Sequence, residues 1–256
     1  MGSPPSVSTS AGGGLVVRST VPPGRKYPEY REFLRWDFLN SCAYCSISEA
    51  EARAINFTID HYEARSARSD LANSYENLMY CCNWCNVLKG DRYPPQAARS
   101  AGHRFFRCDE DKFDDHFQLD GIALASRSKT GEYTIHAIAL NRGQLRRLRE
   151  LRQRLQSCHD EVAQGVLGLR KVKIDQLPPP IRSRVLALVR RAQDTSDRIQ
   201  TEIDDILRDH AKSPFLDLRA ETDEERKTRE AALKSIQGLF EGNWRGRDQK
   251  IRSANP

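Results

Sequence analysis

The sequence predicts an α+β protein, in which a small unit of two strands and one helix precedes a mainly α-helical C-terminal region. Two observations support this fold class. Alternating apolar and polar residues lie between two pairs of cysteines, which is the pattern of a half-buried strand. Farther along, Leu145, Leu148, Leu151 and Leu155 recur every three or four residues, which is the spacing of a helix with one buried face.

The chain is expected to divide into three parts. Residues 1–24 are rich in Gly, Ser, Pro and Thr, a composition that buries little apolar surface, so they are expected to form a disordered leader. Residues 25–140 should form a compact domain, and residues 141–256 the helical region. From Tyr27 to Leu39, the spacing of Tyr30, Phe33, Leu34 and Phe38 predicts a helix that packs on the domain core.

The four cysteines of two C-x₂-C pairs are the first candidate metal ligands: Cys42, Cys45, Cys82 and Cys85. Four thiolates complete the tetrahedral shell of a structural zinc ion. Cys81 is an alternative to its neighbour, but only Cys82 reproduces the spacing of the first pair, so Cys81 is expected to be a small buried hydrophobe. Cys108 and Cys158 lack such partners and are expected to be unligated thiols.

The segment between the two cysteine pairs predicts a ββα unit. Residues 55–59 should form the first strand and present Asp60 and His61 at its end, and residues 78–80 should pair with it. A helix should begin within the second cysteine pair and end near Gly90, with Asn86 and Lys89 on one face. A unit this small needs a staple, which zinc would supply.

The order of these residues resembles the HNH (ββα-metal) endonuclease family in its zinc-supported form, over roughly Cys42 to Lys89. The resemblance rests on Asp60-His61, on Asn77, and on Asn86 followed three residues later by Lys89. Asn86 stands where the family commonly has histidine, a variant that many members share. The resemblance implies a zinc-supported ββα-metal nuclease core that hydrolyses DNA phosphodiester bonds and leaves a 5′ phosphate and a 3′ hydroxyl.

The resemblance also implies a role for each motif residue. His61 would be the general base, because an imidazole gains and loses a proton near neutral pH. Asp60 and Asn86 would hold one catalytic Mg²⁺ or Mn²⁺ through oxygen atoms. Asn77 would support the active-site loop, and Lys89 would contact a phosphate. Simpler interpretations remain: His61 as a further zinc ligand, Asp60 as a turn cap and Asn86 as a helix-surface residue.

Two other classes of function compete with a free-standing DNA endonuclease. The first is a non-catalytic zinc-finger module that binds nucleic acid or protein. The second is a nuclease that acts beside a separate ATPase or sensor subunit in bacterial restriction or phage defence, since the chain has no P-loop pattern of its own. Asp60-His61 together with Asn86-x-x-Lys89 favours a nuclease, because a binding module needs no base beside a cation site.

Composition agrees with a nucleic-acid partner in a reducing compartment. The net charge of +6 favours a polyanion such as DNA. No run approaches the roughly 20 apolar residues that span a bilayer, and no secretory signal is expected at the start, so no membrane partner is expected. Seven cysteines, four of them in zinc spacing, suit a cytoplasmic protein better than a disulfide framework.

Beyond the motif, a small β extension and several helices are expected. Residues 116–124 predict a hairpin with a type I′ turn at Asp120-Gly121, and residues 132–139 predict a third strand. Three histidines, His103, His116 and His136, are expected to be structural or surface residues.

The helical region is expected to begin with Asn141 as N-cap and Gln144 closing a capping box. Pro178 to Pro180 should separate this helix from a second that ends near His210, and Thr222 with Glu225 should open a third, ending near Leu239.

Arginines crowd the first of these helices outside its leucine stripe. They form either a DNA-binding strip or a solvated face. They are Arg142, Arg146, Arg147, Arg149, Arg152 and Arg154. The expected contacts with DNA are Arg146 and Arg149 here, and Lys89 and Arg92 near the motif.

Overall fold

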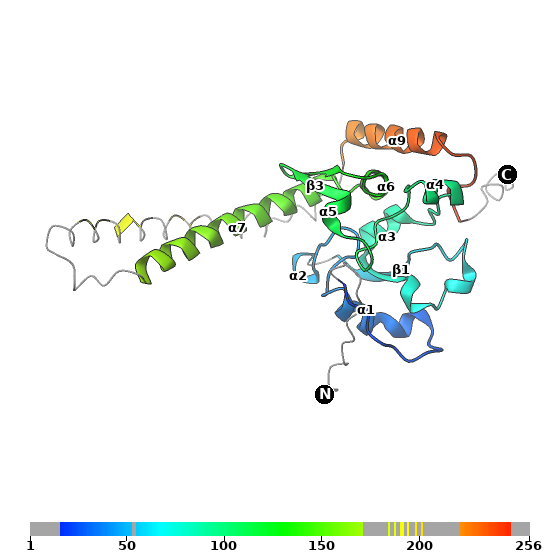
Figure 1. The fold of residues 1–256 in the computed structure, drawn as a ribbon, viewed down its shortest axis with the longest axis horizontal. Helices are drawn as coiled ribbons and strands as arrows, with labels where there is room; N and C mark the ends of the chain where they lie inside the picture. Colours follow the sequence, from blue (N-terminus) through cyan, green and yellow to red (C-terminus); the bar gives the residue numbers. More distant parts are fainter. Residues whose placement is uncertain are drawn as a thin grey trace. The chain divides into compact units, whose positions relative to one another are not determined.

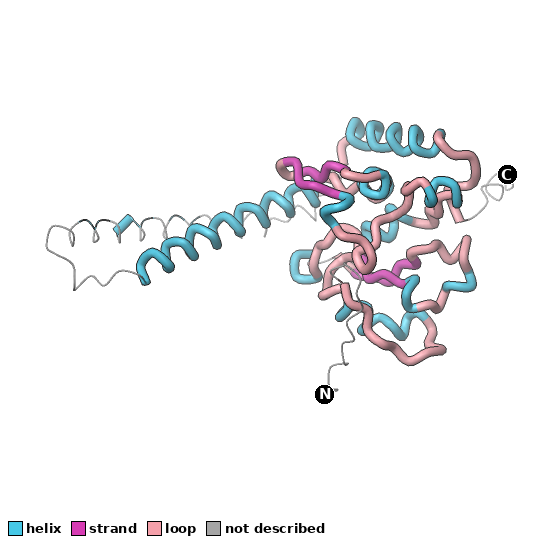
Figure 2. The backbone as a smooth tube through the Cα atoms, viewed as in Figure 1, coloured by secondary structure: helices cyan, strands magenta, loops and turns pink. Residues whose placement is uncertain are grey.

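The computed structural model describes residues 16–52, 55–170 and 221–246, with isolated helical positions between 184 and 201. Figure 1 shows the course of the chain, and Figure 2 shows its helices and strands. The chain forms two compact units, one that joins the residues up to Arg142 with those from Glu221 onward, and one within 143–220. Across the described residues, every helix is too short or too polar to cross a bilayer.

The first unit is built around the predicted ββα core. Strands β1 (Phe57–His61) and β2 (Leu78–Cys82) pair antiparallel, with Asp60 opposite Met79. Helix α3 (Asn83–Lys89) follows β2 without a break and packs against both strands (Figure 1). Gly90 ends α3 with φ of 55°, a left-handed conformation that costs glycine little. This arrangement confirms the expected α+β core, although β1 begins two residues after the expected start at Ile55.

Short helices surround the core. The helix predicted from Tyr27 to Leu39 is a 3₁₀ turn, η1 (Tyr27–Tyr30), that continues into α1 (Arg31–Asp37) and packs against β2. As expected, Tyr30, Leu34 and Phe38 are buried. Helix α2 (Glu49–Ala52) precedes β1, and two 3₁₀ turns, η2 (Ser69–Leu71) and η3 (Tyr75–Asn77), lie between the strands.

The expectation of a disordered leader is wrong for residues 16–24, which are part of the described structure. Residues 1–15 of the expected leader lie outside the described residues. Arg18 pairs with Asp109 at 2.8 Å and donates to the carbonyl oxygen of Leu78 at 2.8 Å. The hydroxyl of Ser19 donates to Asp37 at 2.5 Å. Composition does not predict this order, because a few polar and charged contacts are enough to hold a segment that buries little apolar surface.

The expected hairpin is present, but with a different turn. After α4 (Gln96–Ser100) and α5 (Phe113–His116), strands β3 (Phe117–Asp120) and β4 (Ala123–Ser126) pair antiparallel with Asp120 opposite Ala123. The two turn residues are therefore Gly121 and Ile122, one position later than expected. Gly121 has φ of 58°, while Ile122 does not have a positive φ. Glycine at the first turn position is typical of a type II′ turn.

The strand expected over residues 132–139 is wrong, because helix α6 (Lys129–Ala137) occupies this segment. The β-branched and aromatic residues suggested a strand, but the buried residues Thr130, Tyr133, Thr134 and Ala137 follow helical spacing. The hydroxyl of Ser128 accepts the amide of Gly131 and caps the helix. A Cβ at Gly131 would lie 2.0 Å from the carbonyl oxygen of His116, so glycine lets α6 pack closely there.

The expected single helical region from 141 to 256 is also divided differently. The capping box of Thr222 and Glu225 is confirmed and opens α9 (Asp223–Gly238), which packs on α6 within the first unit. After α9 the chain runs beside residues 91–93, where the amide of Tyr93 donates to the carbonyl oxygen of Trp244. The described end of the chain is thus part of the unit that contains the ββα core.

Helix α7 (Gly143–Arg170) opens the second unit. The expected Asn141 N-cap is wrong, because the helix begins two residues later and the Asn141 amide instead hydrogen-bonds both backbone groups of Leu124. The leucine stripe is buried from Leu145 to Leu151, whereas Leu155 is 42% exposed. Pro178 to Pro180 and most of the helix expected to end near His210 lie outside the described residues.

Candidate active site and metal centre

Four cysteine sulfur atoms lie close together where the first C-x₂-C pair, here called the first knuckle (residues 42–45), meets the start of α3. Those of Cys42, Cys45, Cys82 and Cys85 lie within 4.8 Å of one another, and the Cys45 and Cys82 atoms are 3.8 Å apart. Zinc–sulfur bonds of about 2.3 Å at tetrahedral angles place the sulfur atoms about 3.8 Å apart. The donor set and its dimensions therefore fit one tetrahedral zinc ion. His61 is not part of this group, so the structure gives no support to His61 as a zinc ligand.

The remaining described thiols stand apart from the cluster. Cys81 is fully buried, and burial raises the pKa of its thiol well above the usual value, so it behaves as the small apolar residue that was expected. Burial likewise raises the pKa of Cys108 to about 12. The side chain of Cys158 lies outside the described residues.

Arg142 lies against the cysteine cluster, which the sequence did not indicate. Its guanidinium donates to Cys85 Sγ at 3.6 Å and to the carbonyl oxygens of Ile138 and Ala139. Burial lowers the pKa of Arg142, but the charges of the neighbouring cysteines outweigh this effect and raise it. The expectation that Arg142 belongs to a DNA-binding strip is therefore wrong, because its guanidinium is buried beside the cysteine sulfur atoms.

Asp60 is buried near the end of β1, with only 4% of the residue exposed. Its Oδ2 accepts the hydroxyl of Tyr44 at 2.6 Å, and Lys89 Nζ lies 3.1 Å from Oδ1 and 2.9 Å from Oδ2. An ionised carboxylate offers about four lone-pair sites. These contacts use three of them, so Oδ1 retains the capacity to bind one cation.

His61 is the last residue of β1, and a hydrogen bond of one ring nitrogen fixes the orientation of its imidazole. Nε2 lies 2.9 Å from the carbonyl oxygen of Ala72, and the Tyr27 ring packs edge-on at a centroid distance of 4.9 Å. A carbonyl oxygen can only accept, so Nε2 must carry the proton of this hydrogen bond. In a neutral imidazole the lone pair then resides on Nδ1, which is the atom available to take up a proton.

The two asparagines of the motif have different environments. Asn77 is buried, accepts the amide of Glu63 at 2.8 Å and donates to the Glu63 carbonyl oxygen at 3.1 Å, so it holds the loop that follows His61. Asn86 is half-buried on α3, and its side chain makes no hydrogen bond within the described part of the chain. Its amide oxygen is therefore available to a ligand.

A cleft of about 350 Å³ brings Asp60, His61 and Asn86 together. Arg65 and Asp91 also line it, and neither could be identified from the sequence, because single charged residues in loops are ordinary. Arg65 is exposed and forms no ion pair among the described residues, whereas Asp91 pairs with Arg245 at 2.8 Å. The cleft thus combines an imidazole, two side chains with oxygen atoms that can bind a cation, and an accessible guanidinium.

Lys89 does not line the cleft, contrary to the expectation that it contacts a phosphate. Its side chain is completely buried, and its ammonium also donates to the His61 carbonyl oxygen at 2.7 Å. The expected contact with a phosphate is wrong, because Asp60 and His61 use its donors. Arg92 is half-buried and donates to the carbonyl oxygens of Leu88 and Lys89 at the end of α3.

The arginines expected to contact DNA on α7, Arg146 and Arg149, are both half-exposed. They belong to the second unit, apart from the unit that holds the cleft.

Comparison with known proteins agrees with the geometry. The family model of HNH endonucleases matches residues 42–92, a segment that begins at the first cysteine ligand and ends just after α3. No curated protein and no solved structure matches the chain. The matched segment contains the four clustered cysteines as well as Asp60, His61 and Asn86. Residues 42–92 of this protein are thus similar to an HNH endonuclease domain.

Proposed function

We propose that this protein is a metal-dependent DNA endonuclease that hydrolyses phosphodiester bonds and leaves a 5′ phosphate and a 3′ hydroxyl. The observation that carries the proposal is the cleft that joins His61 to Asp60 and Asn86 within an HNH domain. A zinc-finger binding module, the competing class, has no use for a base beside two oxygen ligands. No feature of the cleft favours that alternative.

His61 is proposed as the general base. The hydrogen bond from Nε2 to the Ala72 carbonyl oxygen keeps the proton on Nε2 and leaves Nδ1 to accept one from a water molecule. When Nδ1 takes up this proton the ring becomes a cation, and the carbonyl oxygen stabilises it because a charged donor strengthens the bond. Asn77 supports the step indirectly by holding the loop that follows His61.

Asp60 and Asn86 are proposed to hold one Mg²⁺ or Mn²⁺ ion through Oδ1 of the carboxylate and the side-chain amide oxygen. Such an ion would neutralise charge on the scissile phosphate and on the departing 3′ oxygen. Lys89 already compensates the charge of Asp60, and Mg²⁺ commonly completes its shell with substrate phosphates and water. The ion is therefore expected to bind weakly until DNA supplies a further ligand.

The four clustered cysteines are proposed to hold a structural zinc ion that has no part in hydrolysis. All four lie outside the cleft, and a tetrahedral shell of thiolates leaves no open position for a substrate. Buried Arg142 would offset part of the negative charge of this shell through its contact with Cys85. The zinc would hold the first knuckle against the start of α3.

Contact with DNA is proposed to involve Arg65 in the cleft and Arg92 beside it, with Arg146 and Arg149 on α7 as further candidates. Arg65 takes the place proposed from the sequence for Lys89, because it is exposed and forms no ion pair within the described chain. An accessible arginine can meet a phosphate with two parallel hydrogen bonds.

Plasmid cleavage tests the proposal. Purified protein is incubated with supercoiled plasmid and Mg²⁺, with and without EDTA, beside a His61→Ala variant whose zinc content and melting temperature match the wild type. Cleavage should require Mg²⁺ or Mn²⁺, and loss of the base should lower the rate about 10²–10⁴-fold. Full activity in EDTA, or in the variant, would contradict the mechanism. DNA binding without cleavage under any metal would favour the zinc-finger module.

The biological setting is proposed to be bacterial restriction or phage defence, with a separate ATPase or sensor subunit as partner. This part rests on the resemblance to small HNH nucleases of that kind. The plating efficiency of phages on bacteria that express the chain, alone and with its genomic neighbours, tests it against a His61→Ala control. Equal plating on both strains in every combination would remove the defence role and leave the nuclease itself untouched.

A further inference from the structure

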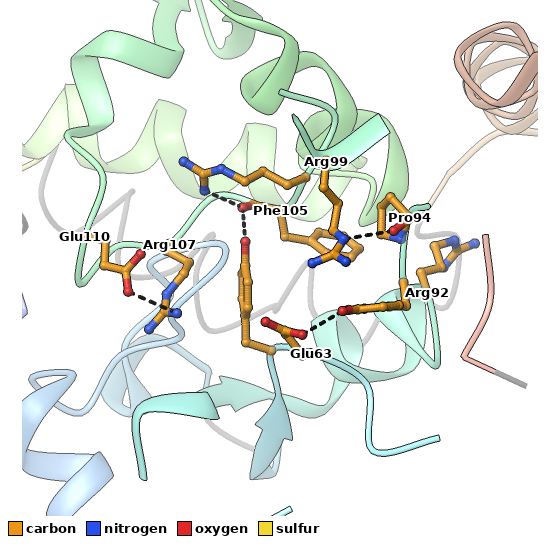
Figure 3. A pocket seen from close by; sticks show the side chains of 10 residues that line it. Glu63, Arg92, Pro94, Arg99, Phe105, Arg107 and Glu110 are labelled. Atoms are coloured by element: carbon orange, nitrogen blue, oxygen red, sulfur yellow. Dashed lines mark hydrogen bonds and ion pairs between the residues drawn. The ribbon is translucent and has the colours of Figure 1, made fainter. Parts of the chain in front are cut away.

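A second hollow lies beside the cleft and has no role in the proposed reaction. Four arginines line this arginine pocket, Arg92, Arg99, Arg104 and Arg107, together with Tyr62 and Tyr93 (Figure 3). Its volume is about 230 Å³, below the ~300–1,000 Å³ of pockets that enclose drug-sized molecules. The space therefore suits a small anionic group better than a whole nucleotide.

Two of the four arginines are neutralised by carboxylates. Arg104 makes two hydrogen bonds with Asp111, at 2.8 and 2.6 Å. Arg107 pairs with Asp109 at 2.8 Å. It also pairs with Glu110 at 3.0 Å (Figure 3). These ion pairs form one wall of the pocket and contribute little net charge to it.

The other two, Arg92 and Arg99, keep their charge. Neither forms an ion pair within the described chain, and both donate only to neutral oxygen atoms. Arg99 also lies over the Tyr93 ring at 4.4 Å, which fixes its plane. Burial and the nearby charge of Arg245 lower the pKa of Arg92 more than the charge of Asp91 raises it.

The acidic residue on the same side does not cancel this charge. Glu63 lines the pocket, but its carboxylate already accepts the Tyr93 hydroxyl at 2.7 Å and pairs with Arg68 at 3.1 Å. The pocket therefore holds two ordered guanidinium groups that form no ion pair with the described residues, in a place that is partly shielded from water. An anion there would gain more than on an open surface, because charges in a protein are screened less than in water.

The arginine pocket and the cleft share two stretches of chain. His61 lines the cleft and Tyr62 lines the pocket, and the same holds for Asp91 and Arg92. The two hollows therefore flank the same two backbone segments. A DNA strand whose scissile phosphate lies in the cleft extends past these segments, so a phosphate that flanks the scissile bond is the anion that the pocket can meet.

We propose that the arginine pocket binds a phosphate of the cleaved DNA strand that flanks the scissile bond, through Arg92 and Arg99. The proposal rests on the proposed endonuclease function, since it assigns the subsite that sets the register of the strand. Arg99 is the residue for a test, because Arg92 also binds the last carbonyl oxygens of α3.

The first experiment measures binding of a DNA duplex as a function of salt, by fluorescence anisotropy, in the non-cleaving His61→Ala background. Adding Arg99→Gln should weaken binding about ten-fold, as the loss of a charge-assisted hydrogen bond predicts, and lower the slope of log K against log salt by about 0.9. Arg127→Gln is the matched control. Arg127 is exposed, also donates to neutral oxygen atoms only, and lines neither hollow.

The second experiment begins without a pocket variant. The cleavage position is mapped with wild-type protein, and single methylphosphonates, which lack the negative charge, are placed at each flanking linkage. At one flanking linkage, the methylphosphonate should lower the affinity of the His61→Ala protein for the DNA. In a protein that also carries Arg99→Gln, the methylphosphonate at that linkage should no longer change the affinity. This scan decides the case even if Arg99→Gln lowers the melting temperature.

The outcomes separate the two proposals. A wild-type protein that neither binds nor cuts DNA removes the endonuclease function, and the subsite with it. Cleavage by the wild type together with equal effects of Arg99→Gln and Arg127→Gln, or an even methylphosphonate scan, overturns the subsite alone.

Discussion

The hydroxyl of Tyr44 donates to Oδ2 of Asp60 at 2.6 Å, and both groups are buried. Tyr44 lies between Cys42 and Cys45, so one short peptide carries two of the clustered cysteines and a hydrogen bond to the proposed metal ligand of the cleft. Burial, and then the charge of Asp60, raise the pKa of Tyr44 well above its usual value, so the hydroxyl remains a donor. The cysteine cluster and the cleft are thus joined through one side chain.

Tyr44→Phe should impair hydrolysis without releasing zinc. The substitution removes one donor from Asp60 and leaves the ring in place, and loss of such a supporting partner typically costs about 10–100-fold in activity or metal affinity. Cleavage rates over a Mg²⁺ titration measure the effect. Tyr75→Phe is the matched control, because Tyr75 donates to Asp37 at the same 2.6 Å and neither residue lines the cleft. Equal effects of the two changes would mean that Tyr44 acts only through stability.

Lys89→Met should destabilise the domain and make its stability depend on Mg²⁺. Removing one partner of a buried ion pair leaves an uncompensated charge on Asp60 and costs about 3–5 kcal/mol. A cation at Asp60 should restore part of this loss. Melting temperatures measured with and without Mg²⁺ should therefore differ more in the variant than in the wild type. If Lys89 instead contacted DNA, the variant would keep its stability and lose binding.

Cys82→Ala should remove zinc and melt the domain, whereas Cys81→Ala should keep zinc and lower stability by roughly 1 kcal/mol, as for a typical buried substitution. The two residues are adjacent in β2, but only Cys82 belongs to the sulfur cluster. Zinc per chain by elemental analysis, together with thermal unfolding, distinguishes them. The opposite pattern would move the ligand to Cys81.

The ββα core could be predicted because local signals agree there. The alternating strand, the cysteine spacing and Gly90 as a helix stop each indicate the same arrangement. Spacing also placed Asn86 and Lys89 on one face of α3, but spacing does not predict how deeply each side chain is buried. Asn86 borders the cleft, while Lys89 lies buried under Asp60.

The contacts of Tyr44 and Arg142 could not be predicted in this way. Each joins segments that are distant in the sequence, 16 residues apart for Tyr44 and Asp60 and 57 for Arg142 and Cys85. The prediction of a strand over residues 132–139 was wrong for another reason. Their β-branched and aromatic side chains favour strands, and burial with helical spacing in α6 outweighed that preference.

Charge reversal of Arg146 and Arg149 to Glu tests whether α7 takes part in DNA binding. If both meet phosphates, the slope of log K against log salt should fall by about 0.9 for each lost contact. Stability should change little, since ion pairs of accessible side chains contribute only about 0–1 kcal/mol. The control reverses Arg226 and Lys227, two exposed residues of α9, and gives the same net charge. Equal binding by the two double variants would assign α7 a role other than DNA contact. The DNA would then be held by Arg65 in the cleft and by the arginine pocket.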